Sequence, residues 1–342
     1  MTLLCWMVLS AWASPMEGIN VEEAPDALEE VEVELPPSQS ELLEEGVALR
    51  RVGAFADAEA MLIRAKDQPE GLGDQVGYQL GVLHEVQERW EQAIAVYSTV
   101  AENWPNSETA SDARFRRAYC LEEMGRHKEA ILAVRALQSD GRWSEDDERT
   151  MQLQRGITEI RAGRTRRGIR RVLYHLESGT DNRTWIRAKA RLALVRAQTA
   201  AAAEIVLKGD KKAARRLKQR AQLIGAAEKQ AIVMFNLGEP EFALEGLLML
   251  GDAYQRLYDD MLAYPPPRSI KAADQAAYRE AVKAKAAVLK AKAHARYDEG
   301  VRVAARTQWV GSVTQRLKEK RLATAEHGQM DQPESSASEA PR

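Results

Sequence analysis

The chain has 342 residues, of which 45% are hydrophobic and only four are Phe, so it is long enough to bury a sizeable core built mainly from Ala and Leu. Its β-branched residues are scattered and form no alternating runs, which argues against strands and predicts an all-α fold. The formal net charge of −2 hides an asymmetry, because an acidic amino-terminal segment precedes a basic helical body.

The first residues, 1–13, have the features of a signal peptide. Leu3 to Ala13 form an apolar run that ends in Ala11, Trp12, Ala13 and Ser14, the pattern of small residues that signal peptidase recognises. We expect cleavage after Ala13 and export to the periplasm or cell envelope. No Lys or Arg precedes the run, which leaves a late start codon or another kind of segment open. The run is too short to span a bilayer.

Residues 14–40 are expected to form a flexible spacer. From Ser14 to Glu45 the chain holds 11 acidic residues and no Lys or Arg, and prolines interrupt the segment. Such a segment cannot bury enough apolar area to offset its ordering entropy. It is either a tether that holds the rest of the chain away from an envelope surface or a solvated tail, and the sequence leaves both open.

Between residues 41 and 180, small residues recur at a nearly constant interval. Gly46, Gly81, Ala118 and Gly156 each lie on an expected first helix, and successive positions are 35, 37 and 38 residues apart. A second small residue follows on the next expected helix, as Ala93 follows Gly81, so that the two backbones can approach closely. No single helix pair buries its apolar face alone, so about four pairs are expected to stack into an array.

This pattern resembles the tetratricopeptide repeat family, whose unit is an antiparallel helix pair of about 34 residues. The resemblance implies a right-handed α-solenoid of helical hairpins, followed here by an extension of longer helices. The segment Tyr97 to Ile131 is similar to repeats of Gram-negative envelope proteins, such as an outer-membrane-assembly lipoprotein and the Tol-Pal coordinating protein. Pro105 should end one helix in it, and Ser107 should cap the next. Gly168 stands where the family has Ala, which predicts a distorted fourth unit.

The resemblance also implies where a partner binds. In this family the first helices of the pairs line a concave surface, on which partners dock as extended or helical peptides. Aromatic side chains there would supply contact area and charged ones the register. The matching positions of this chain are Arg51, Tyr78, Val82, Glu85, Tyr119, Glu122 and Arg161.

A strongly basic stretch lies between Arg155 and Arg220. Such a helical surface can bind nucleic acid phosphates, an anionic membrane or an acidic protein, or it can simply be solvated. A nucleic acid reader needs interleaved aromatic residues or a recognisable module, and neither occurs, so nucleic acid is a disfavoured partner while peripheral membrane contact stays open. The basic positions are Arg164, Arg166, Arg167, Arg170, Arg171, Lys211, Lys212, Arg215 and Arg216.

Residues 181–265 are predicted to form three longer helices that cap the array. Their apolar periodicity runs from Thr184 to Leu207, from Lys211 to Phe235 and from Pro240 to Tyr264, where a run of prolines stops the last helix.

Residues 266–322 are predicted to form Ala-rich helices, the first from about Ile270 to at least Tyr297. A heptad stripe of small residues on this helix is expected to pack against the same chain. Residues 323–342 are expected to form a disordered tail. The stripe consists of Ala277, Ala281, Ala284, Val288, Ala291 and Ala295.

The sequence predicts no catalytic residue, no metal ion and no cofactor. Only Cys120 would remain after signal cleavage, and its apolar neighbours predict a small buried group. His84 lacks the second His that a zinc-protease helix requires. No serine stands in a nucleophile elbow.

These observations predict a non-enzymatic scaffold or adaptor that binds protein, placed by its signal-like start in a periplasmic or envelope complex. The alternative is a cytoplasmic polybasic module that binds nucleic acid or anionic surfaces. Cell fractionation and the salt dependence of DNA binding would discriminate between the two.

Overall fold

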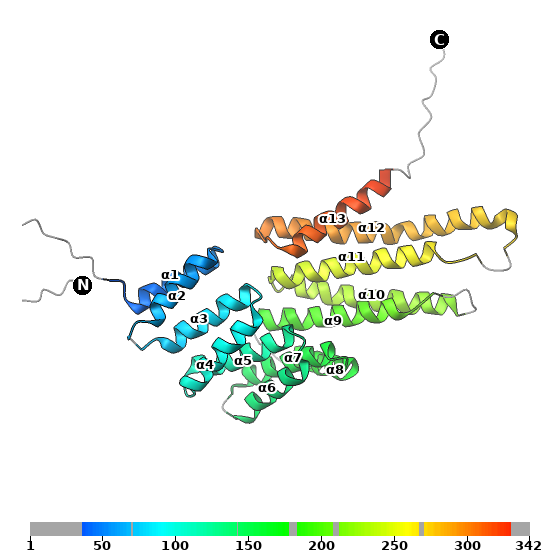
Figure 1. Ribbon diagram of the computed structural model, residues 1–342. Coiled ribbons are helices and arrows are strands. Elements are labelled where there is room, and N and C mark those ends of the chain that lie inside the picture. The colour runs from blue at the N-terminus through cyan, green and yellow to red at the C-terminus, as the bar shows by residue number, and fades with distance from the viewer. Residues whose placement is uncertain are drawn as a thin grey trace, which may run out of the picture. The chain divides into compact units, whose positions relative to one another are not determined.

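The computed structural model describes residues 36–69, 71–141, 143–177, 183–207, 212–266 and 270–329. These residues form thirteen α-helices and one short 3₁₀ helix, with no strand among them, and the helices all lie in one unit, Ser38–Arg342 (Figure 1). The fold is therefore an all-α solenoid, as the sequence predicts. The signal-like segment, most of the acidic spacer and Lys211 lie outside the described residues.

The first eight helices form four hairpins, each made of two consecutive helices that pack on one another. Neighbouring hairpins also pack, α2 on α3, α4 on α5 and α6 on α7. The helices are α1 (Gln39–Arg51), α2 (Phe55–Lys66), α3 (Gly73–Val86), α4 (Trp90–Asn103), α5 (Glu108–Glu123), α6 (His127–Ser139), α7 (Glu145–Arg161) and α8 (Thr165–Glu177). The Ser107 hydroxyl accepts a hydrogen bond from the Ala110 N–H at 3.0 Å, which confirms the expected cap of α5.

The four hairpin turns repeat one hydrogen bond. The N–H groups of Ala54, Arg89, Arg126 and Arg164 each donate to the carbonyl oxygen five residues earlier, at 2.8 to 3.0 Å. These positions are again 35, 37 and 38 residues apart, so the interval seen in the sequence is the interval of the structure. The turn needs a left-handed backbone, which three hairpins obtain from glycine and the second from Glu88 at a φ of 57°.

The small residues of the first helices make room for larger ones on the second helices. An ideal Cβ on Gly81 would lie 2.4 Å from the Tyr97 ring, and one on Gly46 would lie 2.8 Å from Leu62. The larger residue stands 16 positions after the glycine in both hairpins. The sequence predicts that Gly81 faces the small residue Ala93. In the structure the side chain closest to Gly81 is that of Tyr97, so a small residue on the first helix also accommodates a large one on the second.

The fourth hairpin, for which the sequence predicts a distorted unit, is tightly packed at Gly168. A Cβ on Gly168 would lie 2.6 Å from the carbonyl oxygen of Gly156 and 2.8 Å from the backbone nitrogen of Ile160. No side chain fits in this space. Glycine replaces alanine here because α7 and α8 approach more closely than the expected pattern requires.

Longer helices follow the four hairpins, in the places where the sequence predicts them. They are α9 (Thr184–Glu204), α10 (Ala213–Phe235), α11 (Pro240–Leu262), the 3₁₀ helix η1 (Ala272–Asp274), α12 (Gln275–Thr307) and α13 (Ser312–Gln329). The α9 helix packs on α7, α8, α10 and α11, and α11 packs on α12. No described helix is long and apolar enough to cross a bilayer.

The stripe of small residues predicted for the packed face of α12 is wrong. All six residues, from Ala277 to Ala295, are exposed. The buried face instead contains Ala286, Ala293, Tyr297 and Gly300. A stripe of alanines carries little burial free energy, so the orientation of α12 follows its one large buried side chain, Tyr297, which packs against Gly251 of α11.

Two predicted boundaries move by a few residues. The α1 helix begins at Gln39, inside the expected spacer, because Ser38 and Glu41 form a capping box. The α13 helix extends to Gln329, so residues 323–329, expected in the tail, are helical.

Candidate protein-binding groove

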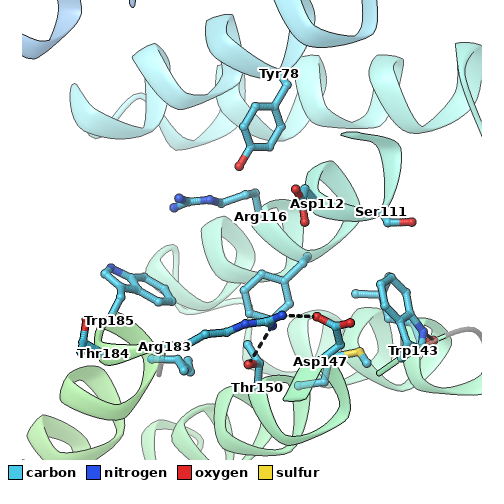
Figure 2. Close-up of a pocket in the computed structure, with 14 residues that line it drawn as sticks. Tyr78, Ser111, Asp112, Arg116, Trp143, Asp147, Thr150, Arg183, Thr184 and Trp185 are labelled. Carbon is cyan, nitrogen blue, oxygen red and sulfur yellow. Dashed lines mark hydrogen bonds and ion pairs between the residues drawn. The ribbon is translucent and has the colours of Figure 1, made fainter. Parts of the chain in front are cut away.

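A groove lined by first helices runs along the hairpins and consists of two cavities that share Tyr78 and Asp112. The first cavity, of about 540 Å³, lies between α1, α3 and the start of α5 and includes Glu44, Arg51 and Thr109. The second, of about 410 Å³, lies between α3, α5, α7 and the start of α9 (Figure 2). We refer to the two together as the groove and to the second alone as the aromatic cavity.

Four aromatic side chains from four parts of the chain line the aromatic cavity, namely Tyr78, Phe115, Trp143 and Trp185. Trp143 is held because its indole N–H donates to the Leu137 carbonyl at 2.6 Å. Figure 2 shows Trp143 and Trp185 on opposite sides of the cavity and Tyr78 above it. The walls are thus preformed apolar surfaces contributed by α3, α5, α9 and the turn before α7.

The two arginines of the aromatic cavity are already paired. Arg183 donates to Asp147 at 2.6 Å and to the Thr150 hydroxyl at 3.2 Å (Figure 2). Arg116 forms an ion pair with Glu85 at 2.7 Å. Because each guanidinium group has its own carboxylate, neither contributes an uncompensated positive charge.

Asp112 is the exception among the acids of the cavity. No hydrogen bond or ion pair joins its side chain to another described residue, whereas Asp147 is bound by Ser144 and Arg183. Burial, followed by the nearby charge of Glu108, raises the pKa of Asp112 above its usual value. The pKa of Asp147 is lowered: its burial acts the other way, but its hydrogen bonds to Ser144 and Arg183 outweigh that effect.

The structure divides the seven predicted partner-contact residues into two groups. Arg51 and Tyr78 line the groove. Val82 and Tyr119 pack in the core between the second and third hairpins, and Glu85 accepts hydrogen bonds from Tyr97 and Arg116. Glu122 and Arg161 form an ion pair at 2.8 Å, and both line a smaller pocket beside α9. Partner binding by these seven residues stays a prediction.

Glu122 lies at the centre of a buried charge network. Its carboxylate accepts from Arg161 at 2.8 Å and Lys189 at 2.9 Å, and also from Gln154. Burial alone would raise the pKa of Glu122, but the two cations outweigh it and the pKa is lowered. The sequence predicts that Glu122 contacts a partner, whereas the structure places this carboxylate in the interior, held by Arg161, Lys189 and Gln154.

The α9 helix supplies two residues of this region that the sequence argument missed. The Trp185 ring packs edge-on to Tyr119, with centroids 5.6 Å apart, and the Lys189 ammonium group lies 3.8 Å from the centre of the Tyr119 ring. The two residues are four positions apart and so share one helix face. The only available signal was a single Trp in an Arg- and Ala-rich helix.

The predicted basic patch is not one continuous surface. Arg167 and Arg171 pair with the buried Glu159 at 3.2 and 3.1 Å, while Arg164, Arg166 and Arg170 are exposed on or beside α8. The remaining described residues of the patch, Lys212, Arg215 and Arg216, lie at the start of α10, which does not pack on α8. The two groups therefore belong to separate helices.

Cys120 is buried as a free thiol, as predicted, and burial raises its pKa. No group of three His, Cys, Asp or Glu residues in the described part of the chain is arranged to hold a metal ion.

Paired helices with a repeated turn and a repeated glycine contact define a helical-repeat protein of the solenoid class. Residues 43–108 and 78–146 match the family model named tetratricopeptide repeat, so the first three hairpins, from within α1 onward, are similar to repeats of that family. The fourth hairpin lies almost wholly beyond the matched residues, although it shares their turn and spacing.

Two further comparisons add little. Among solved structures, a tetratricopeptide repeat protein from Parabacteroides merdae is similar, with 15% identity, a TM-score of 0.40, and coverage of 84% of this chain and 98% of that one. Comparison with curated proteins gave no significant match.

Proposed function

We propose that the protein is a non-enzymatic scaffold that holds a segment of a protein partner in the groove. The observation that carries this proposal is the pair of adjoining cavities along the first helices of hairpins that are similar to tetratricopeptide repeats. Helical-repeat arrays present extended binding surfaces of this kind. The aromatic cavity, at about 410 Å³, is large enough for a side chain with its neighbouring backbone.

The groove is bounded by the first helices of the first three hairpins, by α7 and by the start of α9. Beyond it, Trp185 packs on Tyr119 and Lys189 pairs with Glu122, and these residues leave only a smaller pocket of about 170 Å³. A partner would therefore be bound over a short stretch, by the first cavity at one end of the groove and the aromatic cavity at the other.

Site-specific photo-crosslinking tests the proposal. A photoreactive amino acid at Thr109, in the groove, should give a covalent adduct with a partner protein in cells of the source organism. The same residue at Lys128, exposed on α6, is the matched control and should give none. Equal labelling from both positions, or no adduct from Thr109, would contradict binding in the groove.

We also propose that the chain works in the periplasm or cell envelope of a Gram-negative bacterium, as part of a multiprotein complex. The support is the apolar run that ends at Ala13 and the envelope-like order of residues between Tyr97 and Ile131. Fractionation of cells that express a carboxy-terminally tagged chain tests this. The mature product should be about 13 residues shorter than the full chain and extracytoplasmic. An uncleaved product found only in the cytoplasm would reject the assignment.

A further inference from the structure

The aromatic cavity has a charge arrangement that distinguishes one class of ligand from another. Its two cations are compensated within the chain, Arg116 by Glu85 at 2.7 Å and Arg183 by Asp147 at 2.6 Å. Its remaining acid, Asp112, has no such partner among the described residues, although its side chain lines both cavities of the groove. The uncompensated charge of the cavity is therefore negative.

The neighbours of Asp112 favour the binding of a positively charged group beside it. Glu108 lies one helical turn before Asp112 on α5, and Asp147 faces it from α7. Asp112 is partly enclosed by the cavity walls but is still exposed to solvent. This partial enclosure and the two carboxylates disfavour its ionised form more than the charges of Arg116 and Arg183 favour it. A positive group placed beside Asp112 would relieve this repulsion, whereas an acidic group would add to it.

The walls suit a cation that is carried on an apolar stem. Aromatic rings attract ammonium and guanidinium groups over their faces, and the methylene stems of Lys and Arg pack on apolar surface. The chain already uses this contact nearby, since the Lys189 ammonium lies 3.8 Å from the centre of the Tyr119 ring and the Arg116 guanidinium 5.7 Å from that of Trp185. Tyr78 and Trp143 also line the aromatic cavity, and among the described residues no cation lies over either ring.

We propose that the aromatic cavity binds a Lys or Arg side chain of an extended segment of the protein partner, with Asp112 as its counter-ion and with Tyr78, Trp143 and Trp185 around its stem. This inference rests on the proposed function, because it specifies which partner segments the groove accepts. An acidic segment is disfavoured, because both arginines of the cavity already hold carboxylates of the chain.

Selection from a displayed library of random 12-residue peptides tests the inference on the full chain. Peptides retained by the wild type and not by a variant with a filled groove, Ser111→Trp, are sequenced. These groove-dependent peptides should contain Lys and Arg several times more often than the starting library. The thermal unfolding of Ser111→Trp, followed by circular dichroism, shows whether that variant is folded, and Thr109→Trp serves in its place if it is not.

The selected peptides are then labelled with fluorescein and titrated against matched variants. Asp112→Asn should weaken binding about two- to fivefold, as expected for the loss of one partner of a charge pair at a residue that is exposed in the free chain. Asp57→Asn, the same change on the exposed face of α2, should leave binding unchanged. A peptide in which Ala replaces the basic residue should bind the wild type as weakly as the original peptide binds Asp112→Asn. The same peptide change should weaken binding to Asp112→Asn only slightly further, because the charge pair is already lost.

The outcomes separate the two proposals. Groove-dependent peptides without enrichment in Lys or Arg, or equal binding by the wild type and Asp112→Asn, would overturn the role of Asp112 and leave the scaffold proposal standing. If the library yields no groove-dependent peptide at all, the scaffold proposal fails, and this inference fails with it.

Discussion

The Lys189 ammonium group lies 2.9 Å from an oxygen of Glu122, although 67 residues separate the two in the chain. Glu122 is fully buried and the Lys189 side chain is only 7% exposed. Since Glu122 belongs to α5 and Lys189 to α9, this ion pair attaches the helices that follow the fourth hairpin to the third hairpin. A buried ion pair is not strongly stabilising in itself, but the removal of one partner leaves an uncompensated charge.

Lys189→Met should lower the free energy of unfolding by about 2 to 4 kcal/mol, because the Glu122 carboxylate keeps only Arg161 as a counter-ion in a buried site. Urea denaturation of the full chain, followed by circular dichroism, measures the change. Glu122→Gln combined with Lys189→Met should cost less than the sum of the two single substitutions, since the double variant has no unpaired charge. Arg126→Ala, which removes an exposed i,i+3 pair with Glu129, should cause no measurable loss. Additive effects of the first two substitutions would show that the pair is not coupled.

The unfolding free energy should depend on pH through Glu122. Its pKa in the folded state lies below its ordinary value of 4.5, so below pH 4.5 the unfolded chain binds more protons than the folded one. The contribution of the carboxylate is therefore present at neutral pH and is lost as the pH falls from 4.5 through the lowered pKa.

The difference in stability between the wild type and Glu122→Gln isolates this contribution, because other groups largely cancel. One such group is Glu85, whose pKa burial raises, so that it acts in the opposite direction. The gap between the two unfolding free energies should be constant near neutral pH and should close in acid. If the difference between the two unfolding free energies instead widens as the pH falls, the pKa of Glu122 in the folded state is raised and not lowered.

Gly81→Ala should destabilise the protein by about 1 to 3 kcal/mol, because the new methyl group would overlap the buried Tyr97 ring. Gly225→Ala is the matched control in a helix. No atom lies within 4 Å of the added Cβ there, so the higher helix propensity of Ala should stabilise the protein by about 0.5 to 1 kcal/mol. Equilibrium urea denaturation of both variants measures these opposite signs. Stabilisation by both substitutions would mean that the Tyr97 ring moves aside freely.

Tyr97→Phe should lower the unfolding free energy by about 1 to 2 kcal/mol, because the Tyr97 hydroxyl donates to the enclosed Glu85 carboxylate at 2.9 Å. Tyr174→Phe is the comparison, since Tyr174 is 67% exposed and its only described side-chain contact is an edge-on packing of its ring against His175. The two midpoints of thermal unfolding, measured under one condition, should separate the variants. Equal midpoints of thermal unfolding for the two variants would show that the hydrogen bond of the Tyr97 hydroxyl does not stabilise the fold.

Features set by local chemistry could be predicted from the sequence. The interval between Gly46, Gly81, Ala118 and Gly156 reappears in the hairpin turns because each first helix needs a small residue at the same height above its turn. Ser107 could be recognised as a cap because its role depends only on its immediate neighbours. Helix positions follow from such signals even where the tertiary contacts are unknown.

Features set by contacts between distant helices could not be predicted. Nothing in the order of residues says that Trp185 and Lys189 would meet Tyr119 and Glu122, since such a contact depends on where α9 runs relative to α5. The aromatic cavity has the same origin, because Trp143 and Trp185 come from separate segments. The prediction that the alanine stripe of α12 is its packed face was wrong for a related reason. The periodicity of alanines does not indicate which face of a helix the rest of the chain covers.

In an ordinary array each repeat contacts only its neighbours, so evolution can duplicate or delete a unit without consequence for distant ones. The bond between Lys189 and Glu122 removes that freedom on one side of α5, because an extra hairpin inserted before α7 would carry the lysine away from its carboxylate. The ion pair therefore limits the number of hairpins between the third hairpin and α9. Hairpins added before α1 would leave the distance between Glu122 and Lys189 unchanged. Lineages that vary in repeat number should vary it at the amino-terminal end.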